Sequence, residues 1–196
     1  MYFLYRSLLR WRLWGSTVKE RSSGENDMWY VIWTITRNEQ DVLDCIGVTF
    51  NPDKYLRAWI PQKKVFWRED GVKSVKLKPA FPGYVFIDTA DPQYVHERLR
   101  GYSNYICVLK NSEGYAPVSE SEQRIISHFT GEDGAVDMSL GVIINGELNI
   151  LDGPLKGMEN RIVKINRHHR TAYVKFDRLL GEERILTFGL EVVEKN

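Results

Sequence analysis

The chain has little of what metal-binding, disulfide-stabilised or secreted proteins depend on. Only two of its 196 residues are cysteine, Cys45 and Cys107, and only four are histidine. Two cysteines are too few for a disulfide framework, and they lack the companion ligands that a structural zinc site needs. We therefore expect no metal and no cofactor, a reducing cytoplasmic location, and two cysteines that serve as small core side chains.

An excess of charge of one sign is also missing. Lysine and arginine number 27 against 26 aspartates and glutamates, which leaves a formal net charge of +1. Proteins that coat nucleic acid or clamp ribosomal RNA depend on many phosphate contacts and are strongly basic. The near-neutral balance argues against that class, so any nucleic-acid contact must be confined to a local patch.

Sequence motifs of catalysis are absent as well. The chain contains no P-loop, no H-E-x-x-H pair and no G-x-S-x-G turn, and neither cysteine has a convincing histidine partner. With 43% hydrophobic and 27% charged residues, the composition is that of an ordinary soluble protein with one domain or two small ones. We predict no catalytic residues and no enzymatic activity.

Residues 1–27 differ in composition from the rest of the chain. Arginines interrupt their apolar run, no small-residue cleavage site follows, and the run is too short to span a bilayer, so neither a signal sequence nor a membrane partner is expected. Leu4, Leu8 and Trp11 fall near one face, which leaves a surface amphipathic helix as an alternative. We interpret the segment as an N-terminal extension, disordered or derived from an upstream start.

Residues 28–131 alternate strand and helix signals. The run "MWYVIWTI" is rich in aromatic and β-branched residues on both faces, which predicts a strand buried on both sides. Asp70-Gly71 separates two extended runs and predicts a hairpin. Ser119 and Glu122 stand in capping-box spacing, which predicts the start of the last of three helices. The order β-α-β-β-α-β-α predicts an α+β fold in which helices flank an antiparallel sheet.

The last third of the chain changes character. The stretch "TGEDGAVDMSLG", Thr130 to Gly141, is small, acidic and poor in bulky residues, so residues 132–144 are predicted to be a linker between domains. Residues 145–196 carry several short strand signals separated by turns, which predicts a small all-β barrel.

Three segments carry a resemblance. "NILDGPLKGMENRIVKIN" resembles a KOW motif, and together with "MWYVIWTI" and "FPGYVFI" it resembles the NusG family of transcription elongation factors from residue 28 to about residue 195. The resemblance implies an NGN-like domain joined to an SH3-like KOW barrel. One departure is Asn160, where the family has a glycine before the second KOW strand; asparagine also adopts positive φ at modest cost.

The resemblance implies a binding groove for RNA polymerase. In this family an aromatic groove on the "FPGY" strand binds the clamp helices of the largest polymerase subunit. Carried over to this sequence, the groove would consist of Phe81, Pro82, Tyr84 and Phe86, with Trp33 on the neighbouring strand. Aromatic side chains dominate interface energetics, which suits such a role. The alternative is that all these rings are core.

The resemblance also places DNA near the loop after the second helix. There Arg100 would hold a phosphate of the non-template strand and Tyr102 would stack on an unpaired base, with Arg37 on the same surface. The predicted hairpin is basic too, which indicates either attraction to DNA or a solvated edge. Its cations between Lys54 and Lys78 are Arg57, Lys63, Lys64, Arg68, Lys73 and Lys76, opposed by Glu69 and Asp70.

The predicted barrel has its own basic residues, several of them at a predicted hairpin tip from Asn166 to Arg170. A solvent-exposed loop is one interpretation and RNA contact is the other, while two adjacent histidines without further ligands make a poor metal site. The resemblance implies nascent RNA, the helicase Rho or a small-subunit ribosomal protein as partners. The candidate RNA-binding residues are Lys156, Arg161, Lys164, Arg167, His168, His169 and Arg170.

These expectations combine into one functional prediction. The chain is expected to be a monomeric elongation regulator that binds RNA polymerase and suppresses pausing or termination, and a specialised paralog of the LoaP or RfaH kind. The alternative is a free-standing RNA-binding or ribosome-associated KOW protein, in which the aromatic groove would have no purpose.

Overall fold

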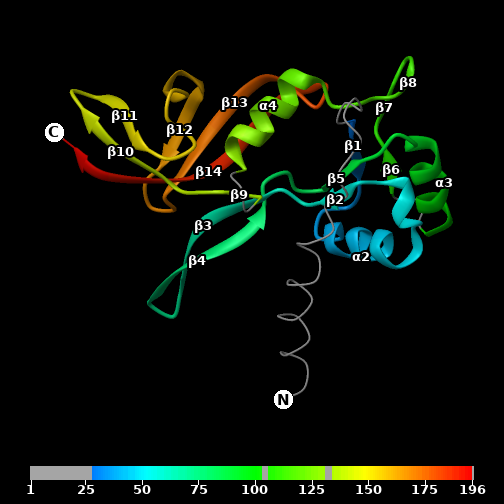
Figure 1. Cartoon of the computed structure of the whole chain (residues 1–196). Helices are drawn as coiled ribbons and strands as arrows, with labels where there is room; N and C mark the ends of the chain where they lie inside the picture. Colours follow the sequence, from blue (N-terminus) through cyan, green and yellow to red (C-terminus); the bar gives the residue numbers. More distant parts are fainter. Residues whose placement is uncertain (1–27, 103–105, 131–133, 196) are drawn as a thin grey trace.

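The computed structural model of the chain describes residues 28–102, 106–130 and 134–195 (Figure 1). The predicted N-terminal extension, residues 1–27, lies outside the described residues. Figure 1 shows a mixed lobe of helices and strands on one side and a lobe of strands on the other, with helix α4 and the hairpin β3–β4 between them.

The mixed lobe is built on a four-stranded sheet with the order β2-β5-β1-β6. Its central strands are antiparallel and pair Trp29 with Asp88 and Trp33 with Tyr84. The predicted antiparallel α+β fold is confirmed. The four strands are β1 (Trp29–Trp33), β2 (Arg57–Trp59), β5 (Tyr84–Asp88) and β6 (Cys107–Val108).

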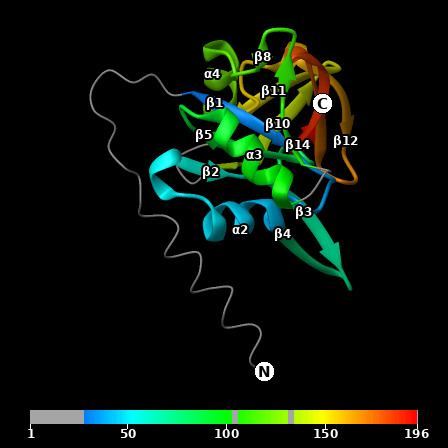
Figure 2. The same ribbon diagram turned by 90° about the vertical axis from the view of Figure 1, so that its right-hand side faces the viewer.

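Two helices, α2 (Glu39–Thr49) and α3 (Pro92–Tyr102), cover one face of this sheet, as Figure 2 shows. Strand alternation sends Ile32, Val85 and Ile87 to that face, where they are fully buried with the apolar sides of both helices. Residues 29–32 of the run "MWYVIWTI" are therefore buried on both faces, as predicted, whereas Met28, Trp33 and Ile35 near its ends are exposed.

The opposite face of the sheet packs against helix α4 (Glu120–Phe129) and the barrel. The capping box predicted for α4 is present, since Ser119 accepts from the Glu122 backbone and Glu122 accepts from the Ser119 backbone. Val31 and Phe86 of the sheet, Phe129 of α4 and the core of the barrel belong to a single apolar cluster. The two lobes thus share one hydrophobic core.

A long hairpin extends from between the two lobes (Figures 1 and 2). It consists of β3 (Gln62–Glu69) and β4 (Val72–Pro79), and its turn is the predicted Asp70-Gly71 with φ of 49° and 81°. Strand β9 (Ala135–Val136) adds to β3 in parallel. A second, short hairpin is formed by β7 (Lys110–Asn111) and β8 (Gly114–Tyr115).

The β-lobe is a five-stranded sheet with the order β11-β10-β14-β13-β12, as expected for a small barrel. The predicted tip is the turn between β12 and β13, where the Asn166 side chain accepts from the His169 backbone at 3.0 Å. The strands are β10 (Ser139–Ile144), β11 (Glu147–Asp152), β12 (Ile162–Asn166), β13 (Thr171–Leu179) and β14 (Glu182–Lys195).

Two details of the predicted barrel are wrong. Residues 139–144 of the predicted linker form β10, which pairs with both β11 and β14 because Val142, Ile143 and Ile144 are β-branched. The residue expected to need positive φ, Asn160, lies instead in a short 3-10 helix, and the left-handed position is taken by Gly157 at φ 82°.

Candidate functional site

The five residues of the predicted polymerase groove divide into buried and accessible ones. Trp33 is 39% exposed, Pro82 is exposed and Tyr84 is half-buried. Phe81 and Phe86 are 5% and 0% exposed and pack against each other with ring centroids 5.5 Å apart. The expectation that these two rings line an open groove is wrong for this structure, because they form the layer beneath the accessible side chains.

Tyr84 is half-buried because the barrel lies against it. The Arg184 guanidinium of β14 stands over the Tyr84 ring, 4.8 Å from its centroid, and donates to the phenolic oxygen at 2.8 Å. A second contact joins the domains nearby, where the Leu180 backbone donates to the Glu122 carboxylate at 2.6 Å. Burial raises the pKa of Glu122, but hydrogen bonds from Ser119, Leu180 and Gly181 outweigh it and lower the pKa.

The "FPGY" bend is fixed by a buried carboxylate that the sequence analysis missed. Glu39 is 4% exposed and accepts from the Gly83 backbone at 2.6 Å and from the Arg37 backbone at 2.8 Å. Gly83 has φ 84°, and an added Cβ would lie 3.0 Å from the Thr34 carbonyl oxygen. Since acidic residues are common in the first turn of a helix, nothing in the sequence marks Glu39 as a long-range acceptor.

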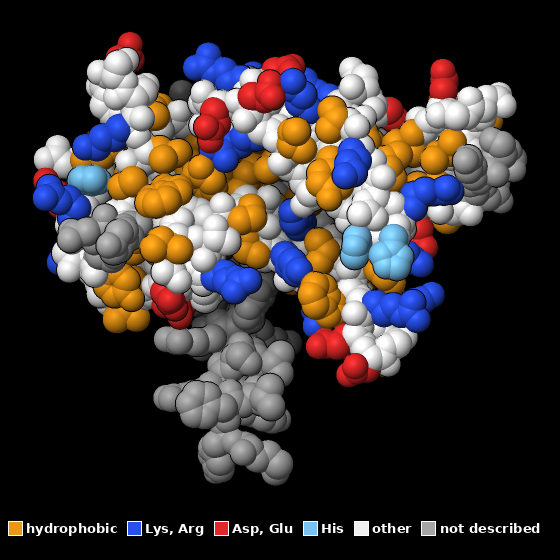
Figure 3. Space-filling model, turned by 180° about the vertical axis from the view of Figure 1, so that it is seen from behind, with side chains coloured by type: hydrophobic (Ala, Val, Ile, Leu, Met, Phe, Trp, Pro, Cys, Tyr) orange, Lys and Arg blue, Asp and Glu red, His pale blue; other side chains and the backbone are white. Residues whose placement is uncertain are grey.

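A hollow with a volume of about 1300 Å³ lies between the β3–β4 hairpin and the barrel. We call it the basic cleft. Figure 3 shows lysine, arginine and histidine side chains gathered around it. Its charged and histidine lining consists of Arg37, Glu39, Lys63, Arg68, Lys73, Lys78, Arg167, His168, His169 and Arg170.

The basic cleft brings together residues predicted for separate surfaces. Arg37, proposed for DNA, and the tip residues 167–170, proposed for RNA, line the same hollow as the hairpin cations. The other barrel candidates, Lys156, Arg161 and Lys164, lie outside it. Sequence reasoning missed the joint site because the hairpin and the tip are about a hundred residues apart.

Aromatic rings line the walls of the cleft between the cations. The Arg170 guanidinium lies 4.2 Å from the centroid of the Phe66 ring. The Trp67 ring has the Lys78 ammonium at 4.2 Å and the Lys76 ammonium at 4.6 Å from its centroid. Such cation–π contacts hold the charged ends over the rings and fix both in position.

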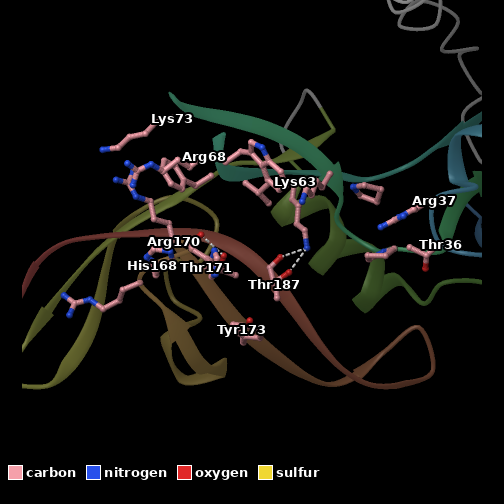
Figure 4. Close-up of a pocket in the computed structure, with 18 of the residues that line it drawn as sticks. Thr36, Arg37, Lys63, Arg68, Lys73, His168, Arg170, Thr171, Tyr173 and Thr187 are labelled. Carbon is pink, nitrogen blue, oxygen red and sulfur yellow. Dashed lines mark hydrogen bonds between the residues drawn. The ribbon is translucent and has the colours of Figure 1, made fainter. Parts of the chain in front are cut away.

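Lys63 is the one cation of the cleft that is buried, at 7% exposure. Figure 4 shows it reaching across to β14, where its ammonium donates to the Thr187 carbonyl at 2.7 Å and to the Thr187 hydroxyl at 2.8 Å. Among the described residues no carboxylate forms an ion pair with it. Burial, and then the charge of Lys78, lower the pKa of Lys63 from 10.5 to about 8.

The lowered pKa predicts a pH dependence of stability. The unfolded chain keeps the ordinary pKa, so between pH 8 and 10.5 it binds more protons than the folded chain and stability rises with pH. Relative to Lys63→Met, the wild type should gain about 3 kcal/mol in free energy of unfolding from pH 7 to pH 11. Urea titrations of both proteins measure this difference. Lys64→Met, the matched control, should follow the wild type, and parallel curves for all three proteins would contradict the prediction.

The predicted DNA contacts Arg100 and Tyr102 stand apart from the basic cleft. Both lie in the last turn of α3, and Tyr102 is 56% exposed. Strand β6 begins five residues after the end of α3, and its Cys107 pairs with Trp33 of β1. The end of α3 therefore lies on the side of the sheet where Trp33 is found. Their role stays a prediction.

Other kinds of site can be described briefly. Within the described residues, no three or more histidine, cysteine or acidic side chains come together in a way that could hold a metal ion. No described helix is both long and apolar enough to cross a membrane.

The fold and the cleft define a class: a two-domain protein in which an α+β sheet domain carries a basic hairpin and packs against a small β-barrel. A family model described as "Transcription termination factor nusG" matches residues 27–127. The chain therefore belongs to the NusG family.

Two curated relatives and one solved structure are similar to this chain. The chain is 22% identical over 177 residues to the transcription termination/antitermination protein NusG of Bacillus subtilis, covering 85% of this chain and 97% of the relative. It is 25% identical over 154 residues to the protein of the same name from Thermus thermophilus, covering 70% and 82%. A solved structure titled "Domain interaction in Thermotoga maritima NusG" is similar with a TM-score of 0.48 and 19% identity, covering 84% of this chain and 94% of that one.

Proposed function

We propose that this chain is a transcription elongation regulator that binds RNA polymerase through its α+β domain and suppresses pausing or termination. Membership of the NusG family supports the proposal, since relatives of this chain are named termination/antitermination proteins. The polymerase contact would be the clamp helices of the largest subunit, and the barrel would contact RNA or a protein such as Rho or a small-subunit ribosomal protein.

The observation that carries the polymerase contact is a group of accessible apolar side chains at one end of the two central strands, β1 and β5. Trp33 and Ile35 are 39% and 47% exposed at the end of β1, and Pro82 is exposed on the bend that leads into β5. Register places Trp33 directly opposite Tyr84. Large exposed aromatics on a rigid strand are typical anchors of protein interfaces. Phe81 and Phe86 would support this face from below.

A retention assay on purified core RNA polymerase tests the contact. Trp33→Ala combined with Tyr84→Ala removes two rings without emptying the core, which Phe86→Ala would do. We expect at least about 2 kcal/mol weaker binding, close to thirtyfold, as for interface hot spots.

Two controls separate this effect from others. Arg184→Ala removes the barrel's contact with Tyr84 but keeps both rings, so binding should be retained. Val48→Ala removes a side chain that is 75% exposed on α2, away from the proposed face, and should bind like the wild type. Equal retention of the double variant and the wild type would refute the polymerase contact.

The specialised-paralog proposal concerns the range of targets. Its basis is the sequence interpretation of two segments, Arg100 to Tyr102 at the end of α3 and the basic tip of the barrel, as departures from the housekeeping pattern. A deletion strain should then change termination at few transcripts. A change at essentially all transcripts would favour a general factor, and ribosome association without polymerase binding would favour the alternative of a free-standing KOW protein.

A further inference from the structure

The basic cleft concentrates charge in a chain that is nearly neutral. Seven lysines and arginines face the hollow, whereas the whole chain carries a net charge of only +1. The one carboxylate of the lining, Glu39, already accepts from the Gly83 and Arg37 backbones. Low-dielectric walls lined by one sign of charge focus a positive potential, which selects a polyanion.

Rings on both walls distinguish this cleft from a simple basic patch. Phe66 and Trp67 belong to the hairpin and Tyr173 belongs to the barrel, and all three are half-buried with part of each ring accessible. Aromatic side chains between cations allow unpaired bases to stack while phosphates contact the charges, whatever the base sequence. An acidic peptide would use the charges but not the rings.

The two walls are held at a fixed spacing. Lys63 of the hairpin donates to Thr187 of β14, and Arg170 of the barrel both covers Phe66 and pairs with Glu191 at 2.9 Å. Gly189 lets β14 approach the hairpin closely, since a Cβ there would lie 3.0 Å from the Lys64 carbonyl oxygen. The volume of about 1300 Å³ exceeds the roughly 300–1000 Å³ of common small-molecule pockets, which fits a segment of a polymer.

We propose that the basic cleft binds single-stranded nucleic acid, with phosphates along Arg68, Lys73 and Arg167 and bases against the rings of the hairpin and the barrel. The site exists only where both domains form it. The proposal rests on the proposed function and deepens it, because it assigns one joint site to the nucleic acid that lies near a transcribing polymerase.

Fluorescence anisotropy with the full chain tests this. The probes are 12-nucleotide single strands of one mixed sequence, as RNA and as DNA, with a 5′ fluorophore. Arg68→Glu on the hairpin and Arg167→Glu on the barrel are exposed and should leave the fold intact. We expect each to weaken binding about tenfold or more. The three proposed phosphate contacts would give the wild type a log–log salt slope of about −2, and the double variant should lose about 1.4 of it.

A matched pair controls for total charge. Arg178→Glu with Arg124→Glu changes the net charge by the same amount at exposed positions outside the cleft, and should alter the affinity less than about twofold. Tighter binding of the RNA probe would identify a transcript as the strand that the cleft binds. Tighter binding of the DNA probe would identify a displaced DNA strand instead. Either result supports the site.

Several results would overturn the proposal. The first is an equal loss of affinity in the cleft pair and in the control pair, and the second is a loss of affinity from the variant on only one wall. The third is a duplex probe that binds as tightly as the single strand. The fourth is displacement of the probe by polyglutamate at the same charge concentration as by nucleic acid. Polymerase retention separates the two proposals. The cleft variants keep Trp33 and Tyr84, so they should lose nucleic-acid binding and retain polymerase binding. The double variant Trp33→Ala with Tyr84→Ala should do the reverse.

Discussion

Replacing Phe129 by alanine is expected to lower the free energy of unfolding by about 3–5 kcal/mol, the usual cost of emptying a large buried ring site. Phe129 is 5% exposed at the end of α4. Its ring stacks on Phe188 with centroids 4.8 Å apart and an interplanar angle of 4°, and its edge meets Phe176 at 5.9 Å. The side chain therefore joins α4 to the barrel within the apolar cluster that the two domains share.

Chemical denaturation followed by tryptophan fluorescence measures the change. Four of the six tryptophans lie in the sheet domain or the hairpin, and the other two, Trp11 and Trp14, lie outside the described residues. Ser127→Ala, at an exposed position of the same helix, should change stability by less than about 0.5 kcal/mol. A loss below 1 kcal/mol for Phe129→Ala would mean that the ring is not held between the domains in solution.

The second large effect is expected for Gly153→Ala in the turn after β11. Gly153 has φ 98°, and an added Cβ would lie 2.6 Å from the Ser139 Cα and 2.9 Å from the Met138 carbonyl oxygen. Both contacts are with backbone, which cannot rotate away as a side chain would. We expect a loss of at least about 3 kcal/mol, because backbone strain and overpacking act together.

Gly157→Ala is the matched control. Gly157 also has positive φ, at 82°, but nothing lies within 4 Å of the added Cβ. Its cost should be limited to the left-handed backbone, about 1–2 kcal/mol. The difference in thermal unfolding between the two variants isolates the steric part. Equal melting temperatures for the two variants would show that the turn around Gly153 moves to accept a side chain.

Local signals in the sequence predicted the elements that depend on neighbouring residues. The Asp70-Gly71 turn, the Ser119 capping box and the tip at 166–170 each follow from a few adjacent side chains with strong conformational preferences. The order of strands and helices then leaves few ways to form a sheet, so the α+β class was predictable as well.

Features that depend on distant contacts were not predictable in the same way. Residues 139–144 were assigned to a linker, but they gain a partner in β14, about fifty residues later. Phe86 was expected to be open, yet its exposure is set by Phe81, by Trp59 on a neighbouring strand and by the docked barrel. Each half of the basic cleft was noticed as a basic segment, but only the packing of two domains places them face to face.

The parallel pair between β9 and β3 has a consequence for how far the domains can separate. Only two residues lie between Val136 of β9 and Ser139 of β10, and a segment this short reaches about 10 Å when fully extended. The start of β10 therefore stays within about 10 Å of β9 while β9 remains paired with β3. The two-residue strand β9 therefore tethers the barrel to the hairpin, and its pairing with β3 must break before the two domains can move far apart.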